Sequence, residues 1–156
     1  MANTIELVSH LDCSADEAWE RVGTSALLHH ITAPLIRFVP RKVTPFPTRW
    51  NVGEYRACMF LLGFLPVGWQ AIRISIPEPE NGVRFLRDNG YGPLIQVWDH
   101  WIEIAPEGGG TRYVDRVTVE AGWLTPLISG FAKLFYSHRQ RRWKALAAAN
   151  FAALDS

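Results

Sequence analysis

Six segments of the chain alternate apolar and polar residues with the period of two that is typical of β-strands. In the first segment, Thr4–Leu11, the side chains of Ile5, Leu7 and Leu11 lie on one face. The other five follow one another through turns rich in glycine and proline, and they cover residues 50–62, 67–76, 82–89, 94–104 and 111–121. Turns this short leave no room for the long crossover that joins parallel strands. The pattern therefore predicts an antiparallel meander.

Two short helices are predicted directly after the first strand. Ser14 and Glu17 form a capping box, in which each side chain satisfies a free backbone amide at the start of a helix. Trp19 and Val22 then supply its apolar face. A second helical segment runs into an extended segment at Pro34, and the proline-rich stretch that follows indicates a stiff connection.

The C-terminal segment repeats apolar residues every three or four positions, which is typical of an amphipathic helix. Leu127, Phe131 and Phe135 belong to this apolar stripe. Thr125 is the expected N-cap, and the pattern continues to Leu154. Such a helix would be about 40 Å long at 1.5 Å per residue.

These elements predict an α+β fold, in which a curved antiparallel sheet of about six strands wraps around one long C-terminal helix. The helix must bury its apolar stripe, and the inner face of a curved sheet is the available surface. We expect residues 1–156 to form a single domain, because a chain of 156 residues can bury roughly 70% of its unfolded surface in one core.

The composition is that of a globular protein, with 48% hydrophobic and 20% charged residues. A formal net charge of +1 gives no electrostatic reason to expect nucleic-acid binding. Seven Trp and eight Phe residues imply either a dense core or a cavity lined by aromatic side chains. Cys13 and Cys58 have no metal-ligand spacing and form no disulfide framework. Because neither a signal peptide nor a membrane-spanning segment is visible, we expect a cytoplasmic protein without integral membrane contact.

Several short motifs, taken in order along nearly the whole chain, resemble the START-like helix-grip superfamily (SRPBCC). This superfamily includes polyketide cyclases, lipid-transfer domains and plant ligand carriers. The similarity is carried by "LDCSADEAWERV", "LLHHITAPL", "GFLPVGWQAIRI", the turn Gly92-Pro93, the Trp98-x-His100 pair, Gly110-Thr111 and Asp115. In the bacterial small-ligand branch, an acidic residue and a glutamine commonly stand where this chain has Arg87 and Asn89.

The resemblance implies a helix-grip fold with a deep hydrophobic cavity between the sheet and the long helix. It implies no particular reaction, since members of the superfamily share no catalytic residue set.

The segment "LIQVWDHWIEIAPEGGGTRYVD" contains the polar residues of greatest interest. If residues 105–110 form the loop of a β-hairpin, His100 stands directly opposite Asp115, with Trp98 and Tyr113 on the same face. Opposed side chains lie about 5 Å apart at Cβ, so His100 and Asp115 are expected to share a hydrogen bond. Because this face is the more apolar of the two, we expect it to line the cavity.

Two interpretations of the pair stay open. As a general acid/base, it would serve the dehydration or cyclisation of a carbonyl substrate. As a buried polar pair, it would be structural or would orient a polar group of a ligand. No nucleophile accompanies the pair.

The preferred hypothesis is a carrier or sensor that binds a small to medium-sized hydrophobic ligand. The alternatives are a cyclase or dehydratase with His100 and Asp115 as catalytic residues, and an interaction module whose own side chains fill its cavity. No metal and no cofactor are expected, and the protein is expected to be a monomer or a homodimer. The expected ligand-binding residues are Leu28, Ile31, Leu35, Met59, Leu61, Trp69, Phe85, Arg87, Trp98, Ile102, Tyr113, Phe131, Phe135 and His138.

A basic cluster near the middle of the long helix is interpreted as a solvated helix face. It consists of Arg139, Arg141, Arg142 and Lys144. The neighbouring pair His29-His30 has no metal-ligand partners at a suitable spacing and is interpreted as a surface or packing element.

Overall fold

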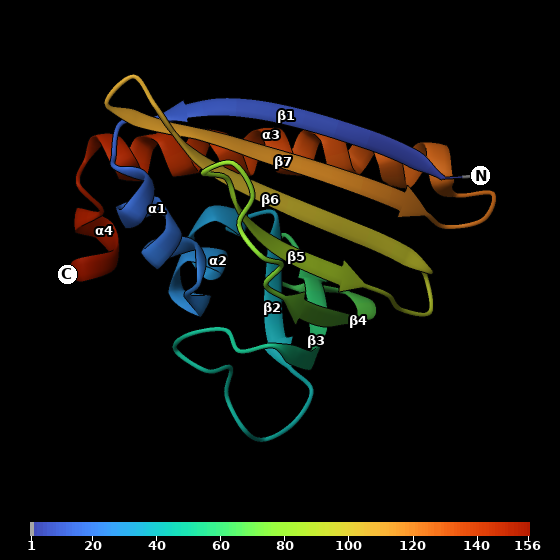
Figure 1. The fold of residues 1–156 in the computed structure, drawn as a ribbon. Helices are drawn as coiled ribbons and strands as arrows, with labels where there is room; N and C mark the ends of the chain where they lie inside the picture. The colour runs from blue at the N-terminus through green and yellow to red at the C-terminus, as the bar shows by residue number, and fades with distance from the viewer. Residues whose placement is uncertain (1) are drawn as a thin grey trace.

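One antiparallel sheet of seven strands forms the larger layer of the computed structural model, which describes residues 2–156 (Figure 1). The strands lie side by side in the order β1-β7-β6-β5-β4-β3-β2. Their bounds are β1 Asn3–Leu11, β2 Ile36–Pro40, β3 Gly53–Leu61, β4 Leu65–Ser75, β5 Arg84–Gly90, β6 Val97–Glu107 and β7 Gly110–Glu120.

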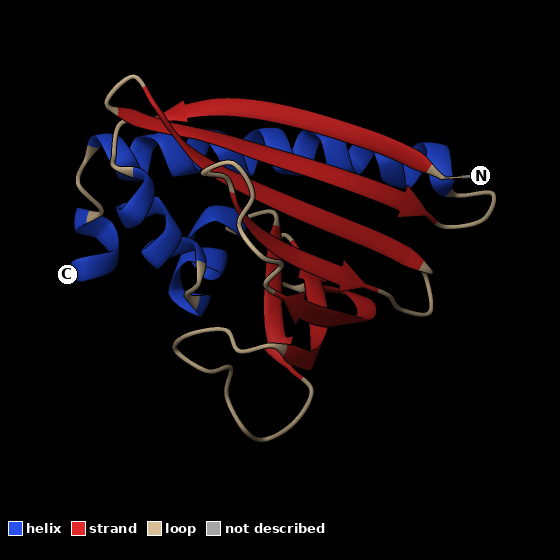
Figure 2. Ribbon diagram, viewed as in Figure 1, coloured by secondary structure: helices blue, strands red, loops and turns tan. Residues whose placement is uncertain are grey.

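The helices are α1 Ala15–Val22, α2 Ser25–Thr32, α3 Thr125–Ala148 and α4 Ala152–Asp155. The long helix α3 runs along β1 and β7, while α1, α2 and α4 gather near its C-terminal end (Figure 2). The predicted α+β architecture, with its two short helices after the first strand, is confirmed. No helix among residues 2–156 is long and apolar enough to cross a membrane.

The strand that the sequence pattern missed is β2, so the count is seven instead of six. It has only five residues and ends at Pro40, inside the stretch interpreted as a stiff connection. It lies at the edge of the sheet and pairs with β3 alone, with Ile36 opposite Leu61. An edge strand tolerates proline because its outer backbone groups have no ladder to complete.

The two short helices begin as the capping residues predict. The Ser14 side chain accepts a hydrogen bond from the Glu17 amide at 3.1 Å. Thr24 does the same for Leu27 at 3.3 Å at the start of α2. These caps turn the chain sharply after β1, which brings both helices to one end of the sheet.

The long helix differs from the prediction at both ends. It begins at Thr125 itself, whose hydroxyl accepts a hydrogen bond from the Ala121 amide at 2.9 Å and closes the turn before the helix. It ends at Ala148 because Asn150 and Phe151 have left-handed backbones, with φ of 51° and 58°. That turn folds the Phe151 ring back against Trp143, with a centroid distance of 6.1 Å. The turn places Phe151 in the core, and for this reason the apolar pattern continues past the end of the helix.

The β6–β7 hairpin is tighter than predicted. Gly108 and Gly109 form a two-residue turn with φ of 54° and 81°, which is the type I′ geometry that glycine favours. His100 therefore pairs with Val117, and Ile102 pairs with Asp115. The predicted register is wrong by two residues, because a two-residue turn replaces the expected six-residue loop. A shift of two leaves every side chain on its predicted face.

Gly110 offers a test of how closely β1 packs against the start of β7. A Cβ at this position would lie 2.6 Å from the Leu11 carbonyl oxygen, whereas a Cβ at Gly130 of α3 would have no atom within 4 Å. We expect Gly110→Ala to lower the free energy of unfolding by about 1–3 kcal/mol through overpacking. Gly130→Ala should raise it by about 0.5–1 kcal/mol through helix propensity. Urea denaturation measures both, and equal stability of the two variants would contradict the close approach.

Candidate functional site

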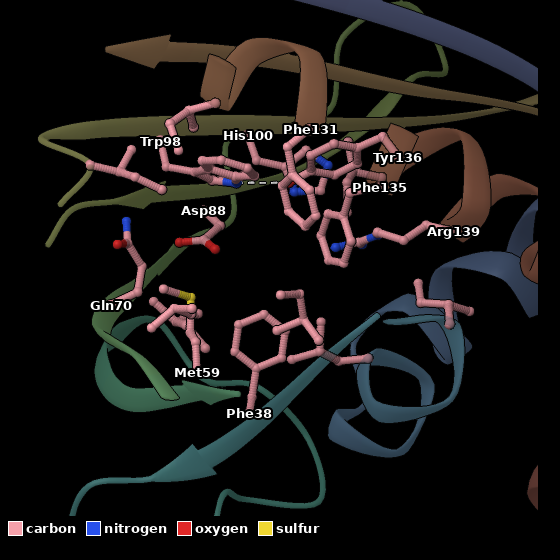
Figure 3. Close-up of a pocket in the computed structure, with 18 of the residues that line it drawn as sticks. Phe38, Met59, Gln70, Asp88, Trp98, His100, Phe131, Phe135, Tyr136 and Arg139 are labelled. Carbon is pink, nitrogen blue, oxygen red and sulfur yellow. Dashed lines mark hydrogen bonds between the residues drawn. The ribbon is translucent and has the colours of Figure 1, made fainter. Parts of the chain in front are cut away.

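A cavity of about 370 Å³ lies between the concave face of the sheet and helices α2 and α3 (Figure 3). Its walls are apolar for the most part. Nine of the predicted residues line it, which are Leu28, Ile31, Met59, Leu61, Trp98, His100, Ile102, Phe131 and Phe135. Other apolar residues of the wall were not predicted from the sequence, among them Ile36, Phe38, Ile72, Ile74, Leu86 and Ile128.

Three residues predicted for the cavity lie on the outer face of the sheet instead. Trp69 packs against Tyr91 at a centroid distance of 6.3 Å. Phe85 packs against Trp101, and Arg87 forms an ion pair with Asp99 at 2.9 Å. Their neighbours in the chain alternate inward, so that Gln70, Leu86 and Asp88 line the cavity in their place. Arg87, which stands where the bacterial branch commonly has an acidic residue, therefore does not change the charge of the cavity wall.

The predicted residues Leu35, Tyr113 and His138 do not line the cavity either. Leu35 is half-buried, but the next residue, Ile36, faces the cavity. Tyr113 is fully buried in the core beside Trp143. The His138 Nε2 atom donates a hydrogen bond to the Ala33 carbonyl oxygen at 2.6 Å, and so joins α3 to the end of α2.

His100 and Asp115 do form the expected hydrogen bond, with 2.7 Å between Nε2 and Oδ1. They are diagonal neighbours on β6 and β7, and both are buried. His100 lines the cavity, whereas Asp115 lies behind it. The Tyr113 hydroxyl also donates to Asp115 Oδ1 at 3.0 Å, and the Gln140 side chain donates to Oδ2 at 3.0 Å.

The two partners of this pair carry different charges. Burial lowers the pKa of His100 and outweighs the opposing effect of Asp115. Burial also disfavours the ionised form of Asp115, but the hydrogen bonds from His100 and Gln140 and the charge of Arg139 together outweigh it and hold the pKa of that carboxyl below its usual value. The pair at neutral pH is therefore a neutral imidazole that donates through Nε2 to a carboxylate.

Arg139 was expected on a solvated face of the long helix, but it is buried. Its side chain lies in the wall of the cavity and is 6% exposed. The guanidinium carbon lies 4.9 Å from the centre of the Tyr136 ring and 5.7 Å from that of Phe135. Among residues 2–156, no carboxylate oxygen lies within 4.0 Å of it, and its Nε atom has no hydrogen-bond partner. The four-residue step from Phe135 to Arg139 is the signal that could have placed it inward.

Besides Arg139, the polar residues Asp88 and Gln70 line the cavity, although the sequence did not predict them there. Asp88 Oδ1 accepts a hydrogen bond from the Arg73 amide at 2.9 Å. Burial raises the pKa of Asp88 to about 7. The Gln70 side-chain nitrogen is buried without a partner among the described residues. Figure 3 shows Asp88 reaching into the cavity from the sheet and Arg139 from α3.

A metal centre is not indicated by the geometry of the chain. Among residues 2–156, no group of three or more His, Cys, Asp or Glu side chains could hold an ion. The polar part of the cavity wall instead comes from Gln70, Asp88, His100, Tyr136 and Arg139, set among apolar side chains. Such a wall suits an organic molecule with a polar end.

Solved structures with low sequence identity share this fold. CV1439 from Chromobacterium violaceum has a TM-score of 0.67 at 13% identity, with 93% of this chain and 96% of that chain covered. A START superfamily protein from Mycobacterium smegmatis has a TM-score of 0.63 at 12% identity, covering 94% and 97%. TTHA0849 from Thermus thermophilus has a TM-score of 0.62 at 10% identity, covering 95% and 99%. These similarities confirm the START-like helix-grip fold.

No functionally curated protein matches the chain. Residues 9–147 match the family described as "Domain of unknown function (DUF8410)". That match covers most of the sequence and takes in the cavity from α2 to Arg139. The chain therefore belongs to the DUF8410 family and folds as a START-like helix-grip domain.

Proposed function

We propose that this protein is a carrier or sensor that binds a small to medium-sized hydrophobic molecule in the cavity between its sheet and α3. The observation that carries the proposal is the volume of about 370 Å³ inside a predominantly apolar wall. This volume falls in the range of small-molecule sites, about 300–1,000 Å³. We further propose that residues 1–156 act as one ligand-binding domain.

The size of the cavity also bears on the interaction-module hypothesis. That hypothesis requires Trp98 and Phe135 to fill the space with their own rings. Trp98 instead donates its indole hydrogen to the Tyr136 hydroxyl at 2.8 Å, and Phe135 packs edge-on against Tyr136 at 5.3 Å. Both rings are thereby held in the wall, which supports a binding function over a filled core.

A pair of tryptophan substitutions on α3 tests the proposed cavity. Ile128 lines the cavity, whereas Leu134 is 56% exposed on the same helix. We expect Ile128→Trp to weaken the binding of the neutral fluorescent probe phenylnaphthylamine roughly tenfold or more, because the indole occupies the probe's volume. Leu134→Trp should bind it as the wild type does. Fluorescence titration measures both affinities, and equal affinities would argue against this site.

A cyclase or dehydratase is the second candidate function. It is favoured by the short His100–Asp115 hydrogen bond at the cavity wall, since Asp115 fixes the imidazole tautomer and leaves Nδ1 as a base. The missing nucleophile restricts such chemistry to proton transfer. In this function, His100 would take a proton from a carbon beside a carbonyl group and return it to a leaving hydroxyl.

Substitution of His100 tests the enzyme interpretation separately from binding. His100→Gln keeps a donor for Asp115 but cannot exchange a proton at neutral pH. If His100 is the acid/base, turnover of a linear β-polyketone should fall by about 10²–10⁴-fold, while phenylnaphthylamine affinity stays the same. The wild-type rate should reach half of its plateau below pH 6.5, because burial lowers the pKa of His100 from its ordinary value of 6.5. Unchanged turnover in the variant would exclude this mechanism.

A further inference from the structure

The cavity wall contains a buried positive charge, Arg139, that forms no close ion pair among the described residues. Arg139 is 6% exposed, and no carboxylate of residues 2–156 lies within 4.0 Å of its guanidinium. An arginine side chain stays protonated in proteins, so Arg139 cannot lose its charge by titration. A buried charge is costly unless an opposite charge or several hydrogen bonds compensate it.

The contacts that Arg139 does make compensate for this only in part. The guanidinium lies over the Tyr136 ring, a cation–π contact with a centroid distance of 4.9 Å. Its Nε hydrogen is buried without an acceptor. The nearby Asp115 carboxylate and Tyr113 hydroxyl also stabilise the positive charge of Arg139. The Tyr113 hydroxyl donates its own hydrogen to Asp115 and can still accept a hydrogen bond from Arg139. The Asp115 carboxylate also accepts hydrogen bonds from His100 and Gln140. A guanidinium has five N–H donors, so a hydrogen bond to Tyr113 leaves further donors of Arg139, the buried Nε hydrogen among them, for a group that enters the cavity.

Asp88 indicates which kind of charged group in a ligand would pair with Arg139. It lies in the wall near enough to Arg139 for the two charges to interact, and its carboxyl is protonated in about half of the molecules near neutral pH. A protonated carboxyl donates a hydrogen bond to a neighbouring carboxylate, as in carboxyl pairs that share one proton. A phosphate monoester carries about −1.5 to −2 charges at pH 7, more than one arginine can balance. A monocarboxylate carries one charge and matches the planar fork of arginine.

We propose that the ligand is an amphipathic monocarboxylic acid, whose carboxylate pairs with Arg139 beside the carboxyl group of Asp88 while its apolar part fills the rest of the cavity. This inference rests on the proposed binding function and names the class of ligand. Gln70, whose amide nitrogen is also buried without a partner in residues 2–156, supplies a further donor in the same wall.

Two probes of equal chain length, decanoate and decanol, separate the carboxylate from the hydrophobic contribution. Arg139→Met removes the charge and keeps an apolar side chain of similar length. We expect this variant to bind decanoate roughly 10- to 100-fold more weakly, as for the loss of a charge-assisted hydrogen bond. Its decanol affinity should match that of the wild type. Arg139→Lys should keep part of the decanoate affinity, because the positive charge remains. Isothermal titration calorimetry measures all six combinations.

The dependence on pH adds an independent readout. The charged and titratable groups around Asp88 are Arg139 and Tyr136 from α3, His100 on the neighbouring strand β6, and Asp99 on the outer face of β6. The Arg73 amide of β4 donates a hydrogen bond to it. From about pH 7 to 8.5, Arg139 stays charged, His100 is neutral because burial lowers its pKa, and Asp99 is paired with Arg87. Asp88, whose pKa is about 7, is the group of this set that gains a negative charge in this range.

Decanoate affinity should therefore fall as the pH rises above 7, by at most about tenfold per pH unit for one proton. Asp88→Asn should bind decanoate with little pH dependence, and decanol binding should be flat in both proteins. A flat decanoate profile in the wild type would overturn the assigned role of Asp88.

The outcomes for Arg139 are distinguishable from failure of the binding function. If Arg139→Met binds both probes as the wild type does, the carboxylate assignment is wrong and the binding function stands. If the variant loses both probes equally and its ligand-free melting temperature falls, Arg139 is a structural residue and the assignment is wrong as well. If neither probe binds the wild type, the proposed function fails and this inference fails with it.

Discussion

Asp115 joins the sheet to the long helix through buried hydrogen bonds. Its carboxylate accepts hydrogen bonds from His100 on β6, Tyr113 on β7 and Gln140 on α3. Gln140 in turn accepts a hydrogen bond from Ser9 and donates one to the Leu7 carbonyl, both on β1. Four elements thus meet at one buried anion. Because α3 is held here at a fixed rotation, Arg139 and Tyr136 are presented to the cavity instead of to solvent.

This arrangement also explains why the His100–Asp115 pair has two plausible roles. A carboxylate that already accepts three hydrogen bonds is well suited to a structural task, since each bond stabilises its charge in a buried position. The same carboxylate holds the imidazole in one tautomer, which is what an acid/base would need. Geometry alone is compatible with both. The Arg139 guanidinium, in contrast, forms no close ion pair among the described residues and keeps a buried Nε hydrogen without an acceptor, and for this reason we assign ligand recognition to Arg139.

The period of two was sufficient to predict which side chains of β6 and β7 face inward. It did not determine how the strands pair, because the segment 105–110 can turn in two residues or in six, and the φ angles of Gly108 and Gly109 decide between these. Arg139 was misjudged because arginine is seldom buried, and its basic neighbours suggested a solvated surface. Asp88 was passed over for Arg87, although simple alternation from the buried Leu86 points to Asp88. For both residues the local period contained the signal, since Arg139 also stands four positions after Phe135, but the preference of charged side chains for the surface was given more weight.

The short strand β2 limits the addition of further strands at one edge of the sheet. Every open sheet has two outer strands whose free backbone groups can capture another chain, the step that starts fibril growth and strand swapping. On one side that outer strand is β2, which ends after five residues at a proline without an N–H group, and the chain continues with Pro45 and Pro47. This margin is poorly suited to accept a further strand. The longer free edge is the opposite one, where β1 has nine residues.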